Sequence, residues 1–378
     1  MAINKKRKKK TKKLMICLSL RISTTDINFQ KIDSLRMEFR RVYNEFIGVW
    51  YRTGKVSKSV FELHKFPHSL LANVRQSARD VAVEAVKSYF ELKKENPYAN
   101  PPAIKDEPMS PRLNYKEGYR IRSEVDNGEK FYKARITISP GDRVKVNLIG
   151  SEKQFTMLEK VLSGEYEIGS CNISKRKKKY YMNISLRNGE IPKPNNNKTF
   201  IGIDTNEKNI ALSAINEHGE VLKSLILDYP VINSERQKYF VIRKWLQKIN
   251  KDSVKKKIQN KEKLVVRDFY HKMSRIAVEW ITQFSSPLII MEDLTNIRNS
   301  INFGKRWNRR LHGWGFRTLQ SMIEYKVNHC SIPVYYCHPA LTSQTCAKCG
   351  LRKKSHKRKR EFTCSWCGHV DHRDRNEA

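Results

Sequence analysis

Residues 200–227, FIGIDTNEKNIALSAINEHGEVLKSLIL, decide the fold of the second half of this 378-residue chain. Apolar runs alternate here with turn-forming Asn, Glu and Gly residues, which predicts an antiparallel meander of three strands. A Lys-rich helical region follows from about Ser234, then a short apolar run over 287–291, a helix over 315–329 and a strand over 332–336. Three strands, helix, strand, helix, strand is the element order of an RNase H-like α/β layer fold. The end of the helical region is predicted to pack on the sheet through residues at helical spacing: Phe269, Met273, Ile276, Trp280 and Phe284.

The charge balance points to a polyanionic partner. The chain has 75 basic and 38 acidic residues, a formal net charge of +37, and this sustained surplus favours nucleic acid as the partner. No apolar run reaches the length of a membrane span, and the basic start lacks a cleavage site for a signal peptidase. We therefore expect an intracellular protein without a membrane partner, in the cytoplasm or nucleoid of a prokaryote or in the nucleus of a eukaryotic or viral host.

The first half of the chain reads as strand, helices and strands. Alternation predicts a first strand over 14–22, and helical spacing predicts helices over 29–51 and 69–93. A Pro-rich linker over 96–111 precedes further strands, predicted over 134–139, 143–148, 169–174 and 180–186. A second linker, GEIPKPNNNK at 189–198, marks a domain boundary.

Several basic clusters are candidate nucleic-acid contacts, and the alternative for each is a solvated charged surface. Residues 5–13 form a basic arm, which is predicted to be a tail, a phosphate-binding arm or a nuclear import signal. The remaining candidates lie on one face of the 69–93 helix, in a Lys-rich hairpin turn and in the stretch WNRRLHGWGF. They are Arg75, Arg79, Lys175, Arg176, Lys177, Lys178, Arg309 and Arg310.

Two cysteine pairs form the most specific motif. Cys346 and Cys349 stand before a glycine in CAKCG, and Cys364 and Cys367 stand before a glycine in CSWCG. Two such knuckles present four thiolates in a tetrahedron, which is the ligand set of one structural Zn²⁺. The glycines are expected to let each knuckle turn back toward its sulfurs, and the Lys- and Arg-rich segment between the pairs is expected to touch phosphate.

Three carboxylates on separate elements suggest a catalytic centre. Asp204 and Glu292 end apolar strands, where a carboxylate is costly unless it is paired or metal-bound, and Asp374 lies in DHRDRN. Carboxylates that converge at one sheet edge can hold two Mg²⁺ or Mn²⁺ ions, which support phosphodiester hydrolysis. Each acid alone is more often a solvated residue or a helix cap, so this prediction needs all three.

The motifs together resemble the TnpB family of transposon-associated nucleases, which is related to the type V CRISPR effectors. The resemblance covers residues 198–378 and extends weakly to residues 66–92. It is carried by GIDTNEKN, RDFYHKMS, MEDLTNIRNS, WNRRLHGWGFRTLQSMIEYK, HPALTSQTCAKCG and CGHVDHRDRN. It implies a D…E…D triad at Asp204, Glu292 and Asp374, with Asp371 as the alternative third position. The sequence departs from the family by stopping at Ala378, where the family continues into a helix packed on the nuclease sheet.

The resemblance also implies a domain plan. An N-terminal wedge β-barrel with a helical insertion would precede a RuvC-like α/β nuclease domain that contains an inserted zinc ribbon. The expected segments are a basic disordered arm at 1–13, the first wedge strand at 14–28, the helical insertion at 29–95, the rest of the wedge at 96–188, a linker at 189–198, the nuclease domain at 199–340, the ribbon at 341–369 and the last nuclease segment at 370–378.

On this basis the expected function is RNA-guided cleavage of DNA. A guide RNA from the transposon end would select target double-stranded DNA beside a short motif that the protein reads, and a monomeric complex is favoured. Three other functions stay open: a compact type V CRISPR effector, a guided repressor with a deficient nuclease site, and a DNA-joining transposase. The last would need a nucleophilic Tyr with a His pair or a DDE triad, and neither is evident.

Overall fold

The computed structural model describes residues 13–294, 315–339, 342–353, 357–358 and 361–378. The chain divides into two compact units between Gly189 and Glu190, inside the stretch 189–198 that reads as a linker. The N-terminal unit holds residues 15–189, and the C-terminal unit holds residues 190–378 together with the described residues 13 and 14. No helix in these described ranges is both long enough and apolar enough to cross a membrane.

The N-terminal unit is built on one seven-stranded sheet with the order β2-β6-β7-β1-β5-β4-β3. Its strands are β1 (Lys13–Ser23), β2 (Arg112–Leu113), β3 (Tyr119–Asp126), β4 (Glu129–Ser139), β5 (Asp142–Ile149), β6 (Glu167–Arg176) and β7 (Lys179–Glu190). The strand β3 at one edge of this sheet reaches β6, which is the neighbour of the opposite edge strand β2, because the hydroxyl group of Tyr119 in β3 donates to the carbonyl oxygen of Gly169 in β6 over 2.9 Å. The sheet is therefore strongly curled.

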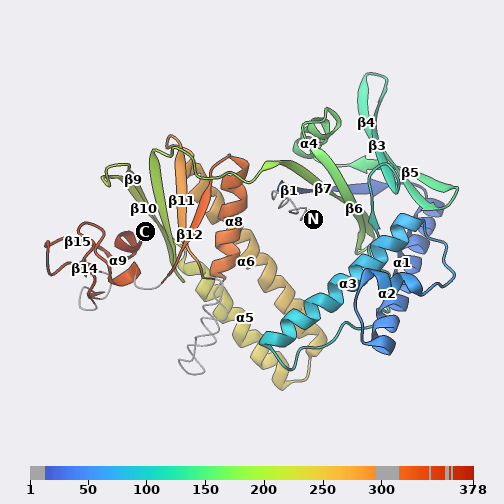
Figure 1. The fold of residues 1–378 in the computed structure, drawn as a ribbon, viewed down its shortest axis with the longest axis horizontal. Coiled ribbons are helices and arrows are strands. Elements are labelled where there is room, and N and C mark those ends of the chain that lie inside the picture. The colour runs from blue at the N-terminus through green and yellow to red at the C-terminus, as the bar shows by residue number, and fades with distance from the viewer. Residues whose placement is uncertain (1–12, 295–314, 340–341, 354–356, 359–360) are drawn as a thin grey trace, which may run out of the picture. The chain divides into compact units, whose positions relative to one another are not determined.

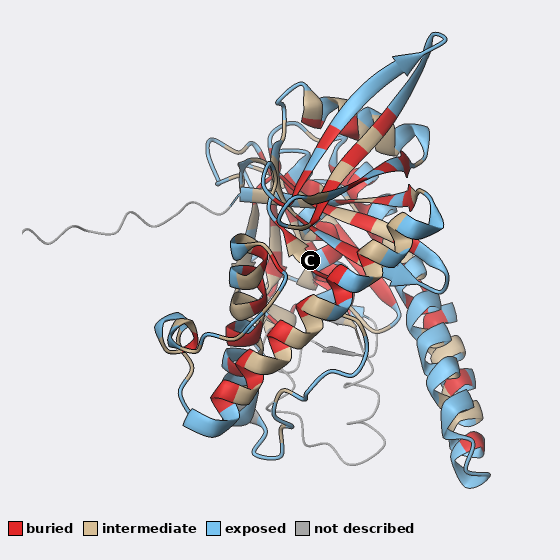
Figure 2. Ribbon diagram, turned by 90° about the vertical axis from the view of Figure 1, so that its right-hand side faces the viewer, coloured by how far each residue is buried: buried red, intermediate tan, exposed pale blue. Residues whose placement is uncertain are grey.

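Four helices accompany this sheet in the described ranges: α1 (Asp26–Thr53), α2 (Lys58–Leu63), α3 (Ala72–Glu95) and α4 (Glu152–Leu162). The hydroxyl oxygen of Thr25 accepts a hydrogen bond from the backbone of Asn28 and caps α1, which ends at Gly54 with a φ of +64°. Buried residues recur at intervals along these helices (Figure 2). The two long predicted helices are thus present, and residues 96–111 hold no regular element, as the Pro-rich stretch predicts.

Some elements of the N-terminal unit were not predicted. The strand β3 has the sequence YRIRSEVD and is exposed beyond Ile121, so it lacks the apolar alternation that marks a half-buried strand. The helix α4 begins with a capping box in which Ser151 and Gln154 bond reciprocally. By contrast, the Lys-rich hairpin is present, because β6 ends at Arg176 and β7 begins at Lys179.

The C-terminal unit contains a five-stranded sheet with the order β10-β9-β8-β11-β12. The meander of the first three strands is antiparallel, whereas β11 is parallel to both β8 and β12. The strands are β8 (Thr199–Thr205), β9 (Asn209–Asn216), β10 (Val221–Asp228), β11 (Pro287–Glu292) and β12 (Val334–Cys337). The element order predicted from the sequence is therefore present.

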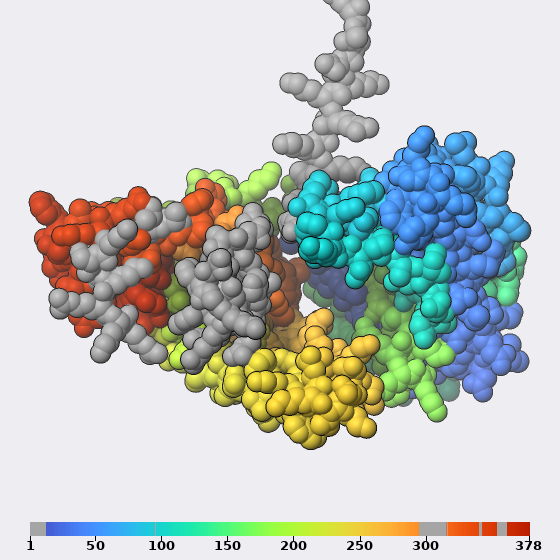
Figure 3. Space-filling view, turned by 90° about the horizontal axis from the view of Figure 1, so that it is seen from below, coloured from blue at the N-terminus to red at the C-terminus, as the bar shows by residue number. Residues whose placement is uncertain are grey.

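Within the described part of this unit, three long helices accompany the sheet: α5 (Pro230–Lys248), α6 (Asp252–Ile281) and α8 (Phe316–His329). Figure 1 shows α6 and α8 beside the strands β11 and β12. The turn between α5 and α6, coloured yellow in Figure 3, is exposed at the molecular surface. The helical stripe predicted for α6 is wrong at Ile276, which is 40% exposed, because the neighbouring Ala277 takes the buried position against the sheet.

Candidate functional site

The sheet of the C-terminal unit places Asp204 and Glu292 side by side. In the parallel pair of β8 and β11, Ile203 lies opposite Met291, so the next residue of each strand is one of the two acids. Both acids therefore sit at the carboxyl ends of neighbouring parallel strands. This edge is where open α/β sheets usually carry their sites.

A short C-terminal helix, α9 (Arg373–Glu377), brings Asp374 to the same edge. Asp204 and Asp374 are only 8% and 6% exposed. One carboxylate oxygen from each lies within 4.8 Å of the other and of a carboxylate oxygen of Glu377. The close contact of α9 with β8 needs a glycine in the strand, because a Cβ atom on Gly202 would lie 1.4 Å from the backbone oxygen of Ala378.

The carboxylates of this cluster repel one another. Burial, followed by the negative charges of Glu377, Glu292 and Asp374, raises the pKa of Asp204 to about 8, and a hydrogen bond from Asn206 only partly opposes this. Carboxylate oxygens are hard ligands that suit Mg²⁺ and Mn²⁺. The described residues thus fit a divalent cation, whose charge would remove the cost of burying several acids together.

Two asparagines in the turn after β8 orient the acids. Asn206 donates its side-chain amide to Asp204 Oδ2 over 2.6 Å. Asn209, at the start of β9, donates its amide to Asp374 Oδ2 over 2.9 Å in a buried hydrogen bond. The turn that connects β8 and β9 therefore holds both carboxylates in place.

Glu292 has a different environment from the two aspartates. Its Oε1 accepts a hydrogen bond of 2.5 Å from the hydroxyl group of Thr342, in the short 3₁₀ helix η2 (Thr342–Gln344). Gln320 of α8 donates to the backbone carbonyl oxygen of the same residue over 2.9 Å. The carboxylate of Glu292 raises the pKa of Asp204 but is not part of the 4.8 Å group among the described residues.

Asp371, the alternative third acid, is held elsewhere. It lies in β15 (Val370–His372), and its carboxylate makes an ion pair of 2.7 Å with Arg375. Within the described residues it does not join the 4.8 Å group. The structure thus brings together Asp204 and Asp374, with Glu292 nearby, and places Asp371 outside this group.

The four predicted cysteines meet at a second site. The Sγ atoms of Cys346 and Cys367 lie 3.7 Å apart, and those of Cys349 and Cys364 lie 3.6 Å apart. Four sulfurs that surround one zinc ion at about 2.3 Å would be about 3.8 Å from each other, so the cluster has the dimensions of a tetrahedral metal site.

The knuckles have the backbone that the sequence predicts. Gly350 and Gly368 have φ values of +73° and +68°, and each donates its N–H to the carbonyl oxygen of the first cysteine of its pair. The N–H groups of Cys367 and Trp366 lower the pKa of the Cys364 thiol to about 6. Despite the N–H of Leu351, burial and the neighbouring thiols raise the pKa of Cys349 to about 12, so four thiolates together would need the charge of a metal ion.

The cysteine site is joined to the carboxylate site. Asn376, 7% exposed in α9, donates its side-chain amide to the carbonyl oxygen of Thr345 over 2.8 Å. Its Oδ1 accepts the N–H of Ala347 over 3.0 Å, next to the first cysteine. The strands β13 (Lys357–Arg358), β14 (Glu361–Thr363) and β15 form a small sheet that leads into α9. Asn376 therefore ties the first knuckle to the helix that carries Asp374.

The predicted nucleic-acid contacts have varied surroundings. The side chains of Arg75 and Arg79 are 13% and 12% exposed and form ion pairs with Glu62, and the guanidinium group of Arg75 also lies over the ring of Phe46. These contacts within the N-terminal unit explain why the two arginine side chains are largely buried. Their contact with nucleic acid stays a prediction.

The hairpin between β6 and β7 presents the other cations. Lys175 donates to Asp33 over 2.7 Å, and Arg176 lies over the ring of Tyr181. Lys177 and Lys178 form the exposed tip. The other two candidates, Arg309 and Arg310, lie outside the described residues.

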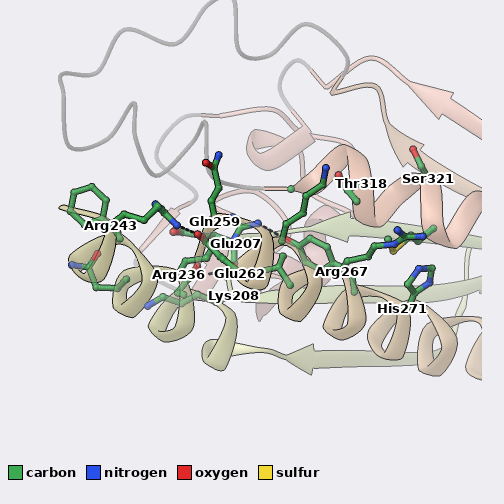
Figure 4. Close-up of a pocket in the computed structure, with 18 of the residues that line it drawn as sticks. Glu207, Lys208, Arg236, Arg243, Gln259, Glu262, Arg267, His271, Thr318 and Ser321 are labelled. Atoms are coloured by element: carbon green, nitrogen blue, oxygen red, sulfur yellow. Dashed lines mark hydrogen bonds and ion pairs between the residues drawn. The ribbon is translucent and has the colours of Figure 1, made fainter. Parts of the chain in front are cut away.

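A cavity of about 1430 Å³ opens between α5, α6 and α8 within the C-terminal unit. Figure 4 shows its charged lining, in which Glu262 and Arg243 form an ion pair. The basic side chains of the lining are Lys208, Arg236, Arg243, Lys263 and Arg267, whereas the acidic ones are Glu207 and Glu262. Lys208, one of the lining residues, follows Asp204 by four positions in the sequence. One end of this positively charged cavity is therefore formed by the turn that follows the strand of Asp204.

Sequence reasoning missed the residues that support the two sites. Asn206, Asn209, Thr342, Asn376 and Glu377 received no role, although all except Glu377 fall inside motifs quoted for the family resemblance. The available signal was the density of amides and hydroxyls next to each predicted ligand. Metal ligands usually depend on such neighbours for orientation.

Comparison with protein families places the C-terminal part of the chain. Residues 316–378 match the model of the Cas12f1-like TNB domain. The match begins with α8 and includes both cysteine pairs and α9. These are the elements that carry the cysteine site and Asp374.

Solved structures match almost the full length of the chain. A Cas12f1–sgRNA–target DNA complex superimposes with a TM-score of 0.65 over 93% of this chain and 82% of that chain, at 14% identity. The mini-RNA-guided endonuclease CRISPR-Cas_phi3 gives a TM-score of 0.58 over 96% of this chain and 91% of that chain, at 12% identity. At these identities the likeness establishes a shared fold of mixed sheets and helices.

Sequence relatives identify the family. The CRISPR-associated endodeoxyribonuclease Cas12f1 of Sulfoacidibacillus thermotolerans is 28% identical over 240 residues, which is 59% of this chain and 55% of that protein. A TnpB-like protein of Methanocaldococcus jannaschii is 31% identical over 249 residues, which is 64% of this chain and 87% of that protein. The chain therefore belongs to the TnpB-like family, which is related to the type V effectors.

Proposed function

We propose that this protein is an RNA-guided, Mg²⁺- or Mn²⁺-dependent DNA endonuclease. A guide RNA derived from a transposon end pairs with target double-stranded DNA, and the protein reads a short motif beside the target. A monomeric complex is favoured. The observation that carries the proposal is the meeting of Asp204 and Asp374, two buried acids 170 residues apart, at the carboxyl edge of one sheet.

In this proposal Asp204, Glu292 and Asp374 hold two divalent cations. When bound, such ions activate water and stabilise the leaving oxygen of a phosphodiester. Asn206 and Asn209 keep the two aspartates oriented, and Thr342 holds the carboxylate of Glu292 at the end of β11. The five-stranded sheet with its helices then serves as a RuvC-like nuclease domain, and the curled sheet of the N-terminal unit serves as the wedge barrel.

The four cysteines hold one structural Zn²⁺ in the zinc ribbon. The spacing between their sulfurs supports this assignment. The ribbon is not remote from catalysis, because the side chain of Asn376 bonds both to Thr345 and to Ala347. Zinc binding would thereby keep α9, and with it Asp374, against β8.

The net charge of +37 and the basic cavity between α5, α6 and α8 support nucleic acid as the partner. Within the described residues, no ion pair occupies Lys208, Lys263 or Arg267, so these cations are available for phosphate groups. Affinity from such contacts does not depend on the sequence of the strand. Selection of the target would come from base pairing to the guide.

A cleavage assay with the purified protein–RNA complex tests this function. The complex should cut a plasmid that carries the matched target in Mg²⁺ or Mn²⁺ and should fail in EDTA. Asp204→Ala should abolish cleavage but leave guide and target binding nearly unchanged, because affinity comes from Lys and Arg contacts with the backbone. Cleavage that persists in EDTA or in Asp204→Ala would refute the assignment of the carboxylate site.

A further inference from the structure

A fourth acid, Glu377, shares the carboxylate site. It is the last residue of α9, and one of its carboxylate oxygens lies within 4.8 Å of oxygens from Asp204 and Asp374. Its side chain is only 12% exposed. Glu377 and Asp374 are three positions apart, so they lie on the same face of the helix.

Surface solvation does not explain this position. The carboxylate is directed to an edge where two other acids are already more than nine-tenths buried. The nearby Arg373 has its Nε 3.6 Å from Glu377 Oε1, and the same guanidinium group lies 3.3 Å from Asp374 Oδ1. His372 Nδ1 also lies 4.0 Å from Asp374 Oδ2, and Asn206 and Asn209 donate their amides to the two aspartates. Burying three clustered carboxylates is still costly, and a bound cation would lower that cost.

An uncharged neighbour gives an independent indication of a missing ligand. The side chain of Asn209 is 5% exposed and donates to Asp374, yet its Oδ1 has no hydrogen-bond partner among the described residues. Buried amide oxygens are normally satisfied. An amide oxygen beside carboxylates is also the kind of atom that hard cations accept as a ligand.

The contrast with Glu292 strengthens the case. The hydroxyl group of Thr342 already donates a hydrogen bond to Oε1 of Glu292. Among the described residues, the carboxylate of Glu292 is not part of the group whose oxygens lie within 4.8 Å of one another. Among the described residues, the carboxylate that lies within 4.8 Å of both aspartates is that of Glu377. We therefore infer that Glu377 is a ligand of the divalent cation at this site, together with Asp204 and Asp374. This inference takes one point from the proposed function, namely that a divalent cation binds at this site.

Manganese binding tests the inference without relying on cleavage. The full chain, freed of nucleic acid and with zinc retained, is titrated with Mn²⁺, and unbound Mn²⁺ is measured by electron paramagnetic resonance. Glu377→Gln should weaken the site at least about tenfold, since even neighbours of metal ligands are worth that much. Glu377→Asp should weaken it less. Glu279→Gln, an exposed acid on α6, is the matched control and should bind like the wild type.

A second readout separates a ligand from a structural residue. Glu377→Gln removes one of several clustered negative charges, so its thermal midpoint without metal should equal or exceed that of the wild type. Its stabilisation by added Mn²⁺ should shrink. A lower midpoint without metal, combined with unchanged Mn²⁺ affinity, would show a structural role and overturn the inference.

The outcomes also distinguish this inference from the proposed function. If Asp204→Asn binds Mn²⁺ as the wild type does, or if the wild type binds none, the carboxylate site is not a metal site. The proposed function and the role of Glu377 are then both wrong. If Asp204→Asn removes the site but Glu377→Gln binds Mn²⁺ as tightly as the wild type, only the role of Glu377 is wrong.

Discussion

The side-chain amide of Asn376 donates to the carbonyl oxygen of Thr345 over 2.8 Å. Through this bond, and through the N–H of Ala347, one buried residue of α9 satisfies the backbone that enters the first cysteine knuckle. Asp374 lies two residues before Asn376 on the same helix. Hydrogen bonds of one side chain therefore connect the cysteine site to the helix of the carboxylate site, and we expect a change at one site to affect the other.

Asn376→Ala should impair both sites at once. The change leaves two backbone groups near the knuckle without their partner, which should lower the free energy of unfolding of the C-terminal unit by about 2 kcal/mol. Cleavage should fall because Asp374 is no longer held. Urea unfolding and plasmid cleavage provide the measurement, with Asn172→Ala, an exposed asparagine of β6, as the control. Normal cleavage by Asn376→Ala would show that the hydrogen bonds between α9 and the first knuckle are not required to position Asp374.

The sequence predicts the residues whose roles follow from local spacing. The two cysteine pairs with their glycines, and the acids that end the apolar strands β8 and β11, can be recognised in this way. Glu377 and Asn376 could not be assigned, because their roles arise from the packing of α9 on β8 and on the knuckle. Ile276 fits the helical period but is exposed, because periodicity does not tell which of two adjacent apolar residues faces the sheet.

Replacing a zinc ligand should remove the metal and, with it, activity. Cys346→Ser or Cys364→Ser should lose about one zinc per chain and destabilise the ribbon, because structural zinc supplies folding free energy. Elemental analysis and thermal melting measure both effects. Cys330→Ser, which changes a cysteine outside the cluster, should keep its zinc. Pure wild-type protein without zinc would contradict the assignment.

The basic cavity should contribute to nucleic-acid affinity in a salt-dependent way. Lys263→Gln combined with Arg267→Gln removes two cations of its lining that form no ion pair with the residues that the structure describes. If both contact phosphate, the slope of log affinity against log salt should fall by about 1.5. Lys272→Gln, on the same helix but paired with Asp268, should change the slope little. An unchanged slope in the double variant would exclude this cavity from the binding surface.

Asp33 should make the N-terminal unit sensitive to acid. Burial alone would raise the pKa of this carboxyl group, but hydrogen bonds from Lys175, Tyr180 and Arg36 lower it below 3.8. Because the folded pKa lies below the unfolded one, the stabilisation is fully present above about pH 4 and is lost as the pH falls through the folded pKa.

Asp33→Asn should therefore destabilise the protein at neutral pH by about 1–2 kcal/mol, and the difference from the wild type should shrink in acid. Thermal melting over a series from about pH 7 to about pH 3 measures it. Asp142→Asn is the control, since its single ion pair with Lys31 is exposed and worth little. A difference that stays constant over the series would show that ionisation of Asp33 is irrelevant.

The central claim, that RNA chooses the DNA to be cut, is tested most directly by plasmid cleavage with exchanged guides. At about 150 mM salt, where nonspecific binding by a chain of net charge +37 is weakened, the complex should cut the matched plasmid and ignore it with a scrambled guide. A reprogrammed guide should move the cut to its own target, and mismatches beside the adjacent motif should block cutting more than distal ones. If protein stripped of RNA cuts the same site as the loaded complex, the protein itself reads the sequence, and the RNA-guided function is wrong.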